Sequence, residues 1–107
     1  MCMPYYVYVI GLDSSVLENK RFHKKNPQYI DGKPCVYVGQ SALTPDERFA
    51  QHREGYKSSP FPKKFGLYLQ KKLFANVNPI SSREEAEVAE EQLAKKLMRR
   101  GYGVWWN

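Results

Sequence analysis

The sequence predicts a small α+β domain in which a three-stranded antiparallel sheet is flanked by helices. Two runs of β-forming residues, at 5–10 and 35–38, predict neighbouring strands. Two capping-box patterns, which begin at Thr44 and Ser82, predict helices directly after them. A chain of 107 residues is long enough for one hydrophobic core and short for two. We therefore expect residues 1–107 to form a single domain.

The first strand is predicted over residues 5–10, with the sequence YYVYVI. Side chains alternate between the two faces of a strand, so Tyr8 shares a face with Tyr6 and Ile10. The stretch 12–34 that follows is polar and basic, and it is too long for a tight hairpin. We interpret it as a basic insertion between the first two strands.

The second strand is predicted over residues 35–38 and contains an unexpected tyrosine. Tyr37 shares a face with Cys35, whereas the flanking valines point to the other face. Antiparallel pairing with the first strand would bring the hydroxyl groups of Tyr8 and Tyr37 to one patch. Two phenols aimed at one place indicate chemistry rather than core packing.

A short helix is predicted after the second strand. Thr44 is a good N-cap residue, and Pro45 suits the first helical position. Glu47 completes the capping box, and Gly55 offers an end to the helix. The pattern over 60–72 is ambiguous but is compatible with a further helix.

The third strand is predicted over residues 73–80, with the sequence LFANVNPI. The final helix is the clearest element, because Ser82 and Glu85 form a capping box and Gly101 follows a basic last turn. The chain closes on the aromatic segment 102–107, which we expect to pack back on the sheet.

Composition limits the partners and the compartment. A formal net charge of +6 favours polyanionic partners, because basic side chains release the counterions condensed on nucleic acids, although solvated helix faces are also often basic. No apolar run has the length of a membrane span, and no signal pattern begins the sequence, so we expect a cytoplasmic protein without a membrane partner. Cys2 and Cys35 are spaced neither as metal ligands nor as a disulfide framework.

One glutamate of the final helix lies on the face expected to meet the core. The apolar positions within one arc of about 80° are Ala86, Ala89, Leu93 and Leu97. Glu90 falls inside the same arc. A carboxylate on a core face is costly unless a cation balances it. That cation is either a metal ion or a lysine or arginine at the edge of the stripe, and the pattern leaves both open.

The short helix carries a second unusual pair. Arg48 and His52 are four residues apart and therefore share a face, with Phe49 beside them. A guanidinium and an imidazole in this arrangement can bind one phosphate together. The alternative is a solvated helix face on which Phe49 alone is buried.

Taken in order, these residues resemble the signature of the GIY-YIG nuclease superfamily over nearly the whole chain. The first signature element is similar to YVY at 6–8, and the second is similar to YVG at 37–39. Arg48 matches the arginine that follows on a helix, and His52 matches the histidine or tyrosine one turn later. Glu90, in EEQLAK, matches the metal-binding glutamate.

The resemblance implies a metal-dependent endonuclease that hydrolyses phosphodiester bonds in DNA, or in RNA. It implies a single Mg²⁺ or Mn²⁺ held by Glu90 and a transition state stabilised by Arg48. Either Tyr8 or Tyr37 would accept the proton of the attacking water, with its pKa depressed by the nearby positive charge. His52 would assist the proton transfer.

The sequence departs from the family pattern at a few positions. Tyr6 stands where the first signature has a glycine, and the insertion at 12–34 replaces a tight hairpin. Gln40 occupies a position where some members have lysine. Asn107 is similar to an asparagine that some members carry near the end of the module.

Nucleic-acid contacts are expected from Lys20, Arg21, Lys24, Lys25 and Gln40. Specificity would come from the insertion, from a homodimer or from a separate recognition partner. A different interpretation is a non-catalytic basic nucleic-acid-binding module of the same fold. It would stack bases on surface aromatics, of which the candidates are Tyr56, Tyr68, Tyr102, Trp105 and Trp106.

Overall fold

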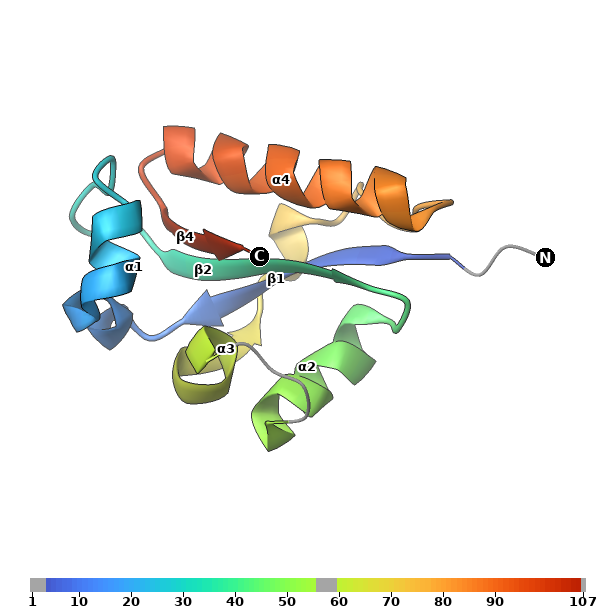
Figure 1. The fold of residues 1–107 in the computed structure, drawn as a ribbon, viewed down its shortest axis with the longest axis horizontal. Helices are drawn as coiled ribbons and strands as arrows, with labels where there is room; N and C mark the ends of the chain where they lie inside the picture. The colour runs from blue at the N-terminus through green and yellow to red at the C-terminus, as the bar shows by residue number, and fades with distance from the viewer. Residues whose placement is uncertain (1–3, 56–59, 107) are drawn as a thin grey trace.

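The computed structural model describes residues 4–55 and 60–106, which fold around one mixed β-sheet (Figure 1). Tyr56 and Asn107 therefore lie outside the described residues. In chain order the elements are β1 (Tyr6–Leu12), the 3-10 helix η1 (Ser14–Glu18), α1 (Lys20–Lys25), β2 (Cys35–Ser41), α2 (Pro45–Glu54), α3 (Pro60–Phe65), β3 (Gly66–Leu69), the 3-10 helix η2 (Lys71–Leu73), α4 (Arg83–Arg99) and β4 (Gly103–Trp106). The predicted α+β class is confirmed.

The two helices with capping patterns begin where the sequence predicts. Thr44 accepts a hydrogen bond from the backbone N–H of Glu47, whose carboxylate accepts one from the Thr44 N–H in return. At α4 the Ser82 hydroxyl accepts from the backbone N–H of Glu85. The Glu85 carboxylate accepts instead from the hydroxyl of Ser81, so only half of that capping box forms.

The sheet has four strands in the order β3-β1-β2-β4. β1 pairs antiparallel with β2, which places Tyr8 opposite Gly39 and Ile10 opposite Tyr37. β3 pairs antiparallel with the other edge of β1. β4 runs parallel to β2 and pairs with it from Cys35 as far as Val38.

The predicted three-stranded antiparallel sheet is therefore wrong in strand number and in the position of its third strand. Leu73 ends η2, residues 75–77 form turns, and within 73–80 only Ile80 makes a β-bridge, to Tyr5. Asn78 takes the place of a strand residue there, because its side chain accepts from the N–H of Val7 at 2.7 Å and donates to the Val7 carbonyl at 2.6 Å. A side-chain amide offers the same donor and acceptor as a peptide group, so this edge of β1 is satisfied without a strand.

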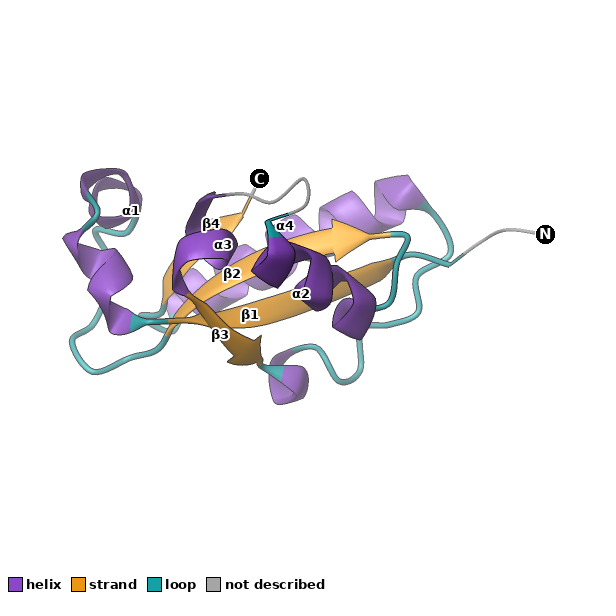
Figure 2. Ribbon diagram, turned by 90° about the horizontal axis from the view of Figure 1, so that it is seen from below, coloured by secondary structure: helices purple, strands orange, loops and turns teal. Residues whose placement is uncertain are grey.

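The closing aromatic segment joins the sheet as a strand instead of only packing on it. Parallel neighbours need a long crossover connection, and the chain from α2 to α4 provides one between β2 and β4. α4 covers one face of the sheet, whereas α2 and α3 cover the other (Figures 1 and 2). The core is thus divided into two layers by the sheet.

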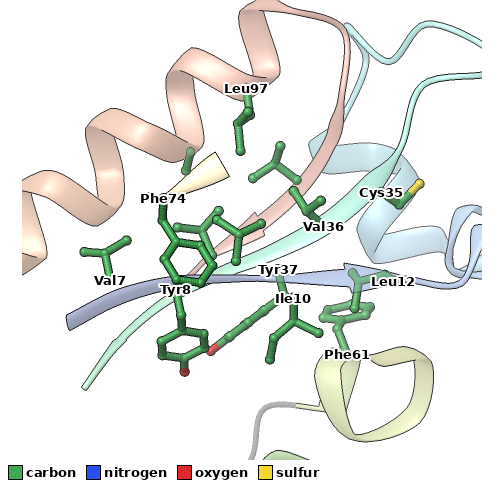
Figure 3. Packing of buried hydrophobic residues seen from close by; sticks show 14 of the residues in the cluster. Val7, Tyr8, Ile10, Leu12, Cys35, Val36, Tyr37, Phe61, Phe74 and Leu97 are labelled. Carbon is green, nitrogen blue, oxygen red and sulfur yellow. The ribbon is translucent and has the colours of Figure 1, made fainter. Parts of the chain in front are cut away.

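The two core layers contain different side chains. On the side of α4, Val7 and Val36 pack towards Leu97 (Figure 3). On the opposite side, Tyr8 and Tyr37 extend towards the α2 and α3 layer (Figure 3). The two predicted catalytic tyrosines therefore lie on the face of the sheet that α4 does not cover.

The basic insertion is a structural part of the sheet edge. Asn26, at the end of α1, is buried, and its side chain donates to the Val104 carbonyl at 3.0 Å and accepts from the Val104 N–H at 2.8 Å. Gln28 continues this edge by donating to the carbonyl of Tyr102. The insertion thus closes the outer edge of β4 with side-chain amides, as Asn78 does for β1.

Replacing Asn26 with alanine is expected to lower the free energy of unfolding by about 2 to 4 kcal/mol, because the N–H and C=O of Val104 would lose their buried partners. Urea denaturation measures the loss. The control is Asn76→Ala, at an exposed asparagine of the η2–α4 connection. Equal stability of the two variants would contradict the role of Asn26.

Among the described residues, none of the helices combines the length and the apolar composition that crossing a bilayer would need.

Candidate active site

A cavity of about 460 Å³ lies where β4 stops beside β2. β4 pairs with β2 only as far as Val38, so the cavity opens beside the last residues of β2 and connects the two faces of the sheet. Its walls include Tyr8, Tyr37, Gln40, Arg48, Glu90 and Trp106. Side chains from β1, β2, α2, α4 and β4 therefore meet at one place.

Tyr8 reaches this cavity because its strand partner has no side chain. The Tyr8 ring crosses β2 at Gly39, where an added Cβ would overlap the Tyr8 hydroxyl and its ring. The ring centroids of Tyr8 and Tyr37 lie 6.3 Å apart, and both side chains line the cavity. The predicted meeting of two phenols is present in the structure.

His52 lies behind Tyr8 and not in the cavity wall. It is 1% exposed, and its Nε2 lies 2.8 Å from the Tyr8 hydroxyl. The edge of its ring meets the ring of Tyr37 at 5.5 Å. Burial, together with the charge of Arg48, lowers the pKa of His52 to about 4. The imidazole is therefore neutral near pH 7 and is placed to hold Tyr8 rather than to contact a phosphate beside Arg48.

Arg48 lines the cavity beside Tyr8. Its guanidinium is hydrogen-bonded to the Tyr8 hydroxyl and donates through Nη1 to the Gln51 side chain at 2.9 Å. Burial raises the pKa of Tyr8 well above its ordinary value, with a further contribution from Tyr37, and the charge of Arg48 only partly opposes this shift. In the protein alone, Tyr8 is a neutral phenol, contrary to the expected depression of its pKa.

Glu90 enters the cavity from the other side of the sheet. Its residue is only 7% exposed, as the helical pattern predicts. Burial and the negative charges of Glu87 and Glu91 raise the pKa of Glu90 to about 7. The ion pairs of α4 use its neighbours: Arg83 binds Glu87 at 3.3 Å, and Lys95 binds Glu91 at 3.7 Å. Within the described residues, no ion pair to the Glu90 carboxylate is formed.

The donor set fits a cation held by one carboxylate. Within residues 4–55 and 60–106, no cluster of three or more histidine, cysteine, aspartate or glutamate side chains could hold a metal ion. Mg²⁺ commonly keeps most of its waters and takes only one or two carboxylates together with substrate oxygens. Glu90 could serve as such a ligand, because it is a buried carboxylate that lines a cavity with polar walls.

The expected nucleic-acid contacts lie in different environments. Gln40 lines the cavity, and Lys20, Arg21 and Lys24 are exposed on α1. Lys25 is half-buried, and its ammonium lies over the rings of both tryptophans of β4. Sequence reasoning did not place Arg83 or Trp106 in the cavity, because no local signal indicates where β4 pairs or ends.

Comparisons of the chain with family models, with curated proteins and with solved structures found no match. The function is therefore inferred from the geometry of the cavity.

Lowering the pH is expected to destabilise the fold through His52. The imidazole has a pKa near 6.5 when unfolded and about 4 in the folded protein, so the unfolded chain binds more protons between these values. The stabilisation is complete above pH 6.5 and is lost as the pH falls towards 4. Urea denaturation at pH 7 and at pH 5 measures the free energy of unfolding, and His52 should account for about 2 kcal/mol of the difference between the two pH values.

The matched variant is His52→Gln, whose amide can still bond to the Tyr8 hydroxyl but does not titrate. Its stability should fall less between pH 7 and pH 5 than that of the wild-type protein. An equal fall in both proteins would show that His52 does not carry the pH dependence.

Proposed function

We propose that this protein is a metal-dependent endonuclease of the GIY-YIG type, which hydrolyses phosphodiester bonds in DNA or RNA. The observation that carries the proposal is the convergence of Tyr8, Arg48 and Glu90 on one cavity from three different elements. Hydrolysis of a phosphodiester needs a base for the attacking water, positive charge at the phosphate and a cation near the reacting oxygens. Each requirement has a candidate group in the cavity.

Arg48 would bind the scissile phosphate. Its guanidinium is half-buried at the cavity wall, where charge–charge interactions are stronger than in bulk water. The negative charge that builds on the phosphate oxygens would then be stabilised without displacing Arg48 from Tyr8 and Gln51, which fix its position.

Tyr8 would relay the proton of the attacking water to His52. Arg48 donates to the Tyr8 oxygen, and a neutral His52 that carries its proton on Nδ1 would offer Nε2 as an acceptor for the phenol's own proton. As the water oxygen bonds to phosphorus and the bond from phosphorus to the departing oxygen breaks, the proton of the water would pass to the Tyr8 oxygen while the Tyr8 proton passes to His52. The departing oxygen would take up a proton from solvent. Tyr8 stays neutral, which suits its raised pKa. The phosphate's negative charge would offset the charge of Arg48 and make the imidazolium less costly.

Glu90 would hold a single Mg²⁺ or Mn²⁺, completed by water and a phosphate oxygen. Bound there, the cation would supply Lewis-acid stabilisation of the phosphate and of the departing oxygen. The remaining alternative is a non-catalytic nucleic-acid-binding module. A buried carboxylate beside the arginine favours the enzyme, because it would repel a phosphate that is only to be bound.

Incubating the protein with supercoiled plasmid and with circular single-stranded DNA, each in Mg²⁺, Mn²⁺ or EDTA, tests the proposal. Cleavage of at least one of these substrates that requires the metal is expected. Salt-sensitive binding of both substrates without cleavage of either in either metal would favour the binding module instead.

A further inference from the structure

Trp106 lies in the wall of the cavity at the end of β4. It pairs with Val38, the last residue of β2 that β4 covers, and it lines the same cavity as Tyr37 and Glu90. Its side chain is half-buried. An indole therefore borders the place where a phosphate would bind, in a cavity whose other named walls are polar or aromatic.

The insertion holds Trp106 in position through Lys25. The Lys25 ammonium lies 4.2 Å from the Trp106 ring centroid and donates a hydrogen bond to the Trp106 carbonyl at 3.3 Å. A cation over an aromatic ring and a hydrogen bond to the same residue restrict both the ring and the backbone. Ordering this ring before substrate binds lowers the entropic cost of stacking against it.

The neighbouring tryptophan has a different role. The Trp105 ring packs on the Phe61 ring, with 4.4 Å between the ring centroids. In the sheet, the backbone of Trp105 pairs with that of Tyr37. Both rings pack against the core, and the Lys25 ammonium lies over both, 4.4 Å from the Trp105 ring centroid and 4.2 Å from that of Trp106. Of the two, Trp106 lines the cavity and Trp105 does not.

A phosphodiester bound by Arg48 carries a nucleoside on each side. In an intact duplex the faces of these bases are covered by neighbouring bases, so an indole can stack only on a base that is unpaired or displaced. We propose that Trp106 stacks on an unpaired nucleobase next to the bound phosphodiester, so that the substrate is a single strand or a junction with splayed nucleotides rather than intact duplex. This inference rests on the proposed function only for the position of the phosphate.

Tryptophan emission reports the stacking directly. The sequence has only two tryptophans, so Trp105→Phe leaves Trp106 as the sole tryptophan. Titration of this variant in EDTA with oligothymidylate is expected to quench the emission, and a matched oligothymidylate–oligodeoxyadenylate duplex should require at least about tenfold higher concentration. Unchanged emission on binding, equal quenching by the duplex, or no binding of the single strand would each overturn the proposal.

Two substitutions at Trp106 separate stacking from packing. Trp106→Leu keeps apolar volume but has no aromatic face, and it should weaken single-strand binding roughly 5- to 150-fold. Trp106→Phe should recover most of the affinity. Equal affinities of the two variants, at matched thermal midpoints, would contradict the stacking role.

The outcomes for the two proposals are distinguishable. Quenching without metal-dependent cleavage would support the stacking site and contradict the proposed nuclease activity. Metal-dependent cleavage with no preference for unpaired nucleotides would support the nuclease and contradict the stacking site.

Discussion

Replacing Glu90 with glutamine is expected to reduce metal-dependent cleavage by at least about 10³-fold, because the cation would lose the buried carboxylate that holds it in the cavity. The glutamine side chain keeps the volume and a hydrogen-bonding oxygen, so the substrate can still enter. The rate of plasmid cleavage under single-turnover conditions measures the effect, and binding of the same DNA in EDTA should change little.

The stability of Glu90→Gln provides an independent check of the same assignment. Glu90 is buried, and its pKa is raised to about 7, so its ionised form is the costly one above that pH. The free energy of unfolding at pH 8 should therefore be unchanged or higher in the variant. Glu84→Gln is the matched control, because Glu84 is exposed at the start of the same helix. If Glu90→Gln cleaves DNA as fast as this control, Glu90 is not the metal-binding residue.

The elements predicted correctly are those with local signals. Alternating residues give β1 and β2, and capping residues fix the starts of α2 and α4. β3 has only four residues and follows α3 without a turn signal, so periodicity cannot separate them. The parallel pairing of β4 with β2 depends on the whole intervening chain, which no short window contains.

The candidate site could be predicted residue by residue but not in its arrangement. A helical wheel places Glu90 towards the sheet, as observed, yet it does not say which sheet face carries Tyr8 and Tyr37. Glu90 and the tyrosines come from opposite sides of the sheet and share a cavity beside the pairing of Val38 with Trp106. The same long-range pairing places Trp106 there.

The burial of His52 could not be predicted from the sequence either. Its spacing from Arg48 predicts a shared helix face but not the depth of each side chain. Arg48 is half-buried at the cavity, whereas His52 is buried against Tyr8. Arg48 and His52 therefore both form hydrogen bonds with the Tyr8 hydroxyl, and of the two Arg48 lines the cavity where a phosphate would bind.

Replacing Tyr8 with phenylalanine is expected to reduce the cleavage rate by about 10² to 10⁴-fold, the usual contribution of a positioned acid–base group. The Tyr8 hydroxyl is bonded to both Arg48 and His52, so its removal breaks the proposed proton path and removes one hydrogen bond that positions the arginine. Single-turnover cleavage measures the rate, and affinity for DNA in EDTA should change less than the rate.

Two comparisons show whether Tyr8 acts through its hydroxyl. The lost hydrogen bond to His52 should lower the free energy of unfolding by about 1 to 3 kcal/mol, so rates must be measured well below the thermal midpoint of the variant. Tyr37→Phe keeps the Tyr8–His52 bond and should slow cleavage less than Tyr8→Phe. A greater loss in Tyr37→Phe would move the base to Tyr37. Full activity in both variants would show that the two hydroxyls have no role in catalysis, because a proton relay through Tyr8 needs the Tyr8 oxygen.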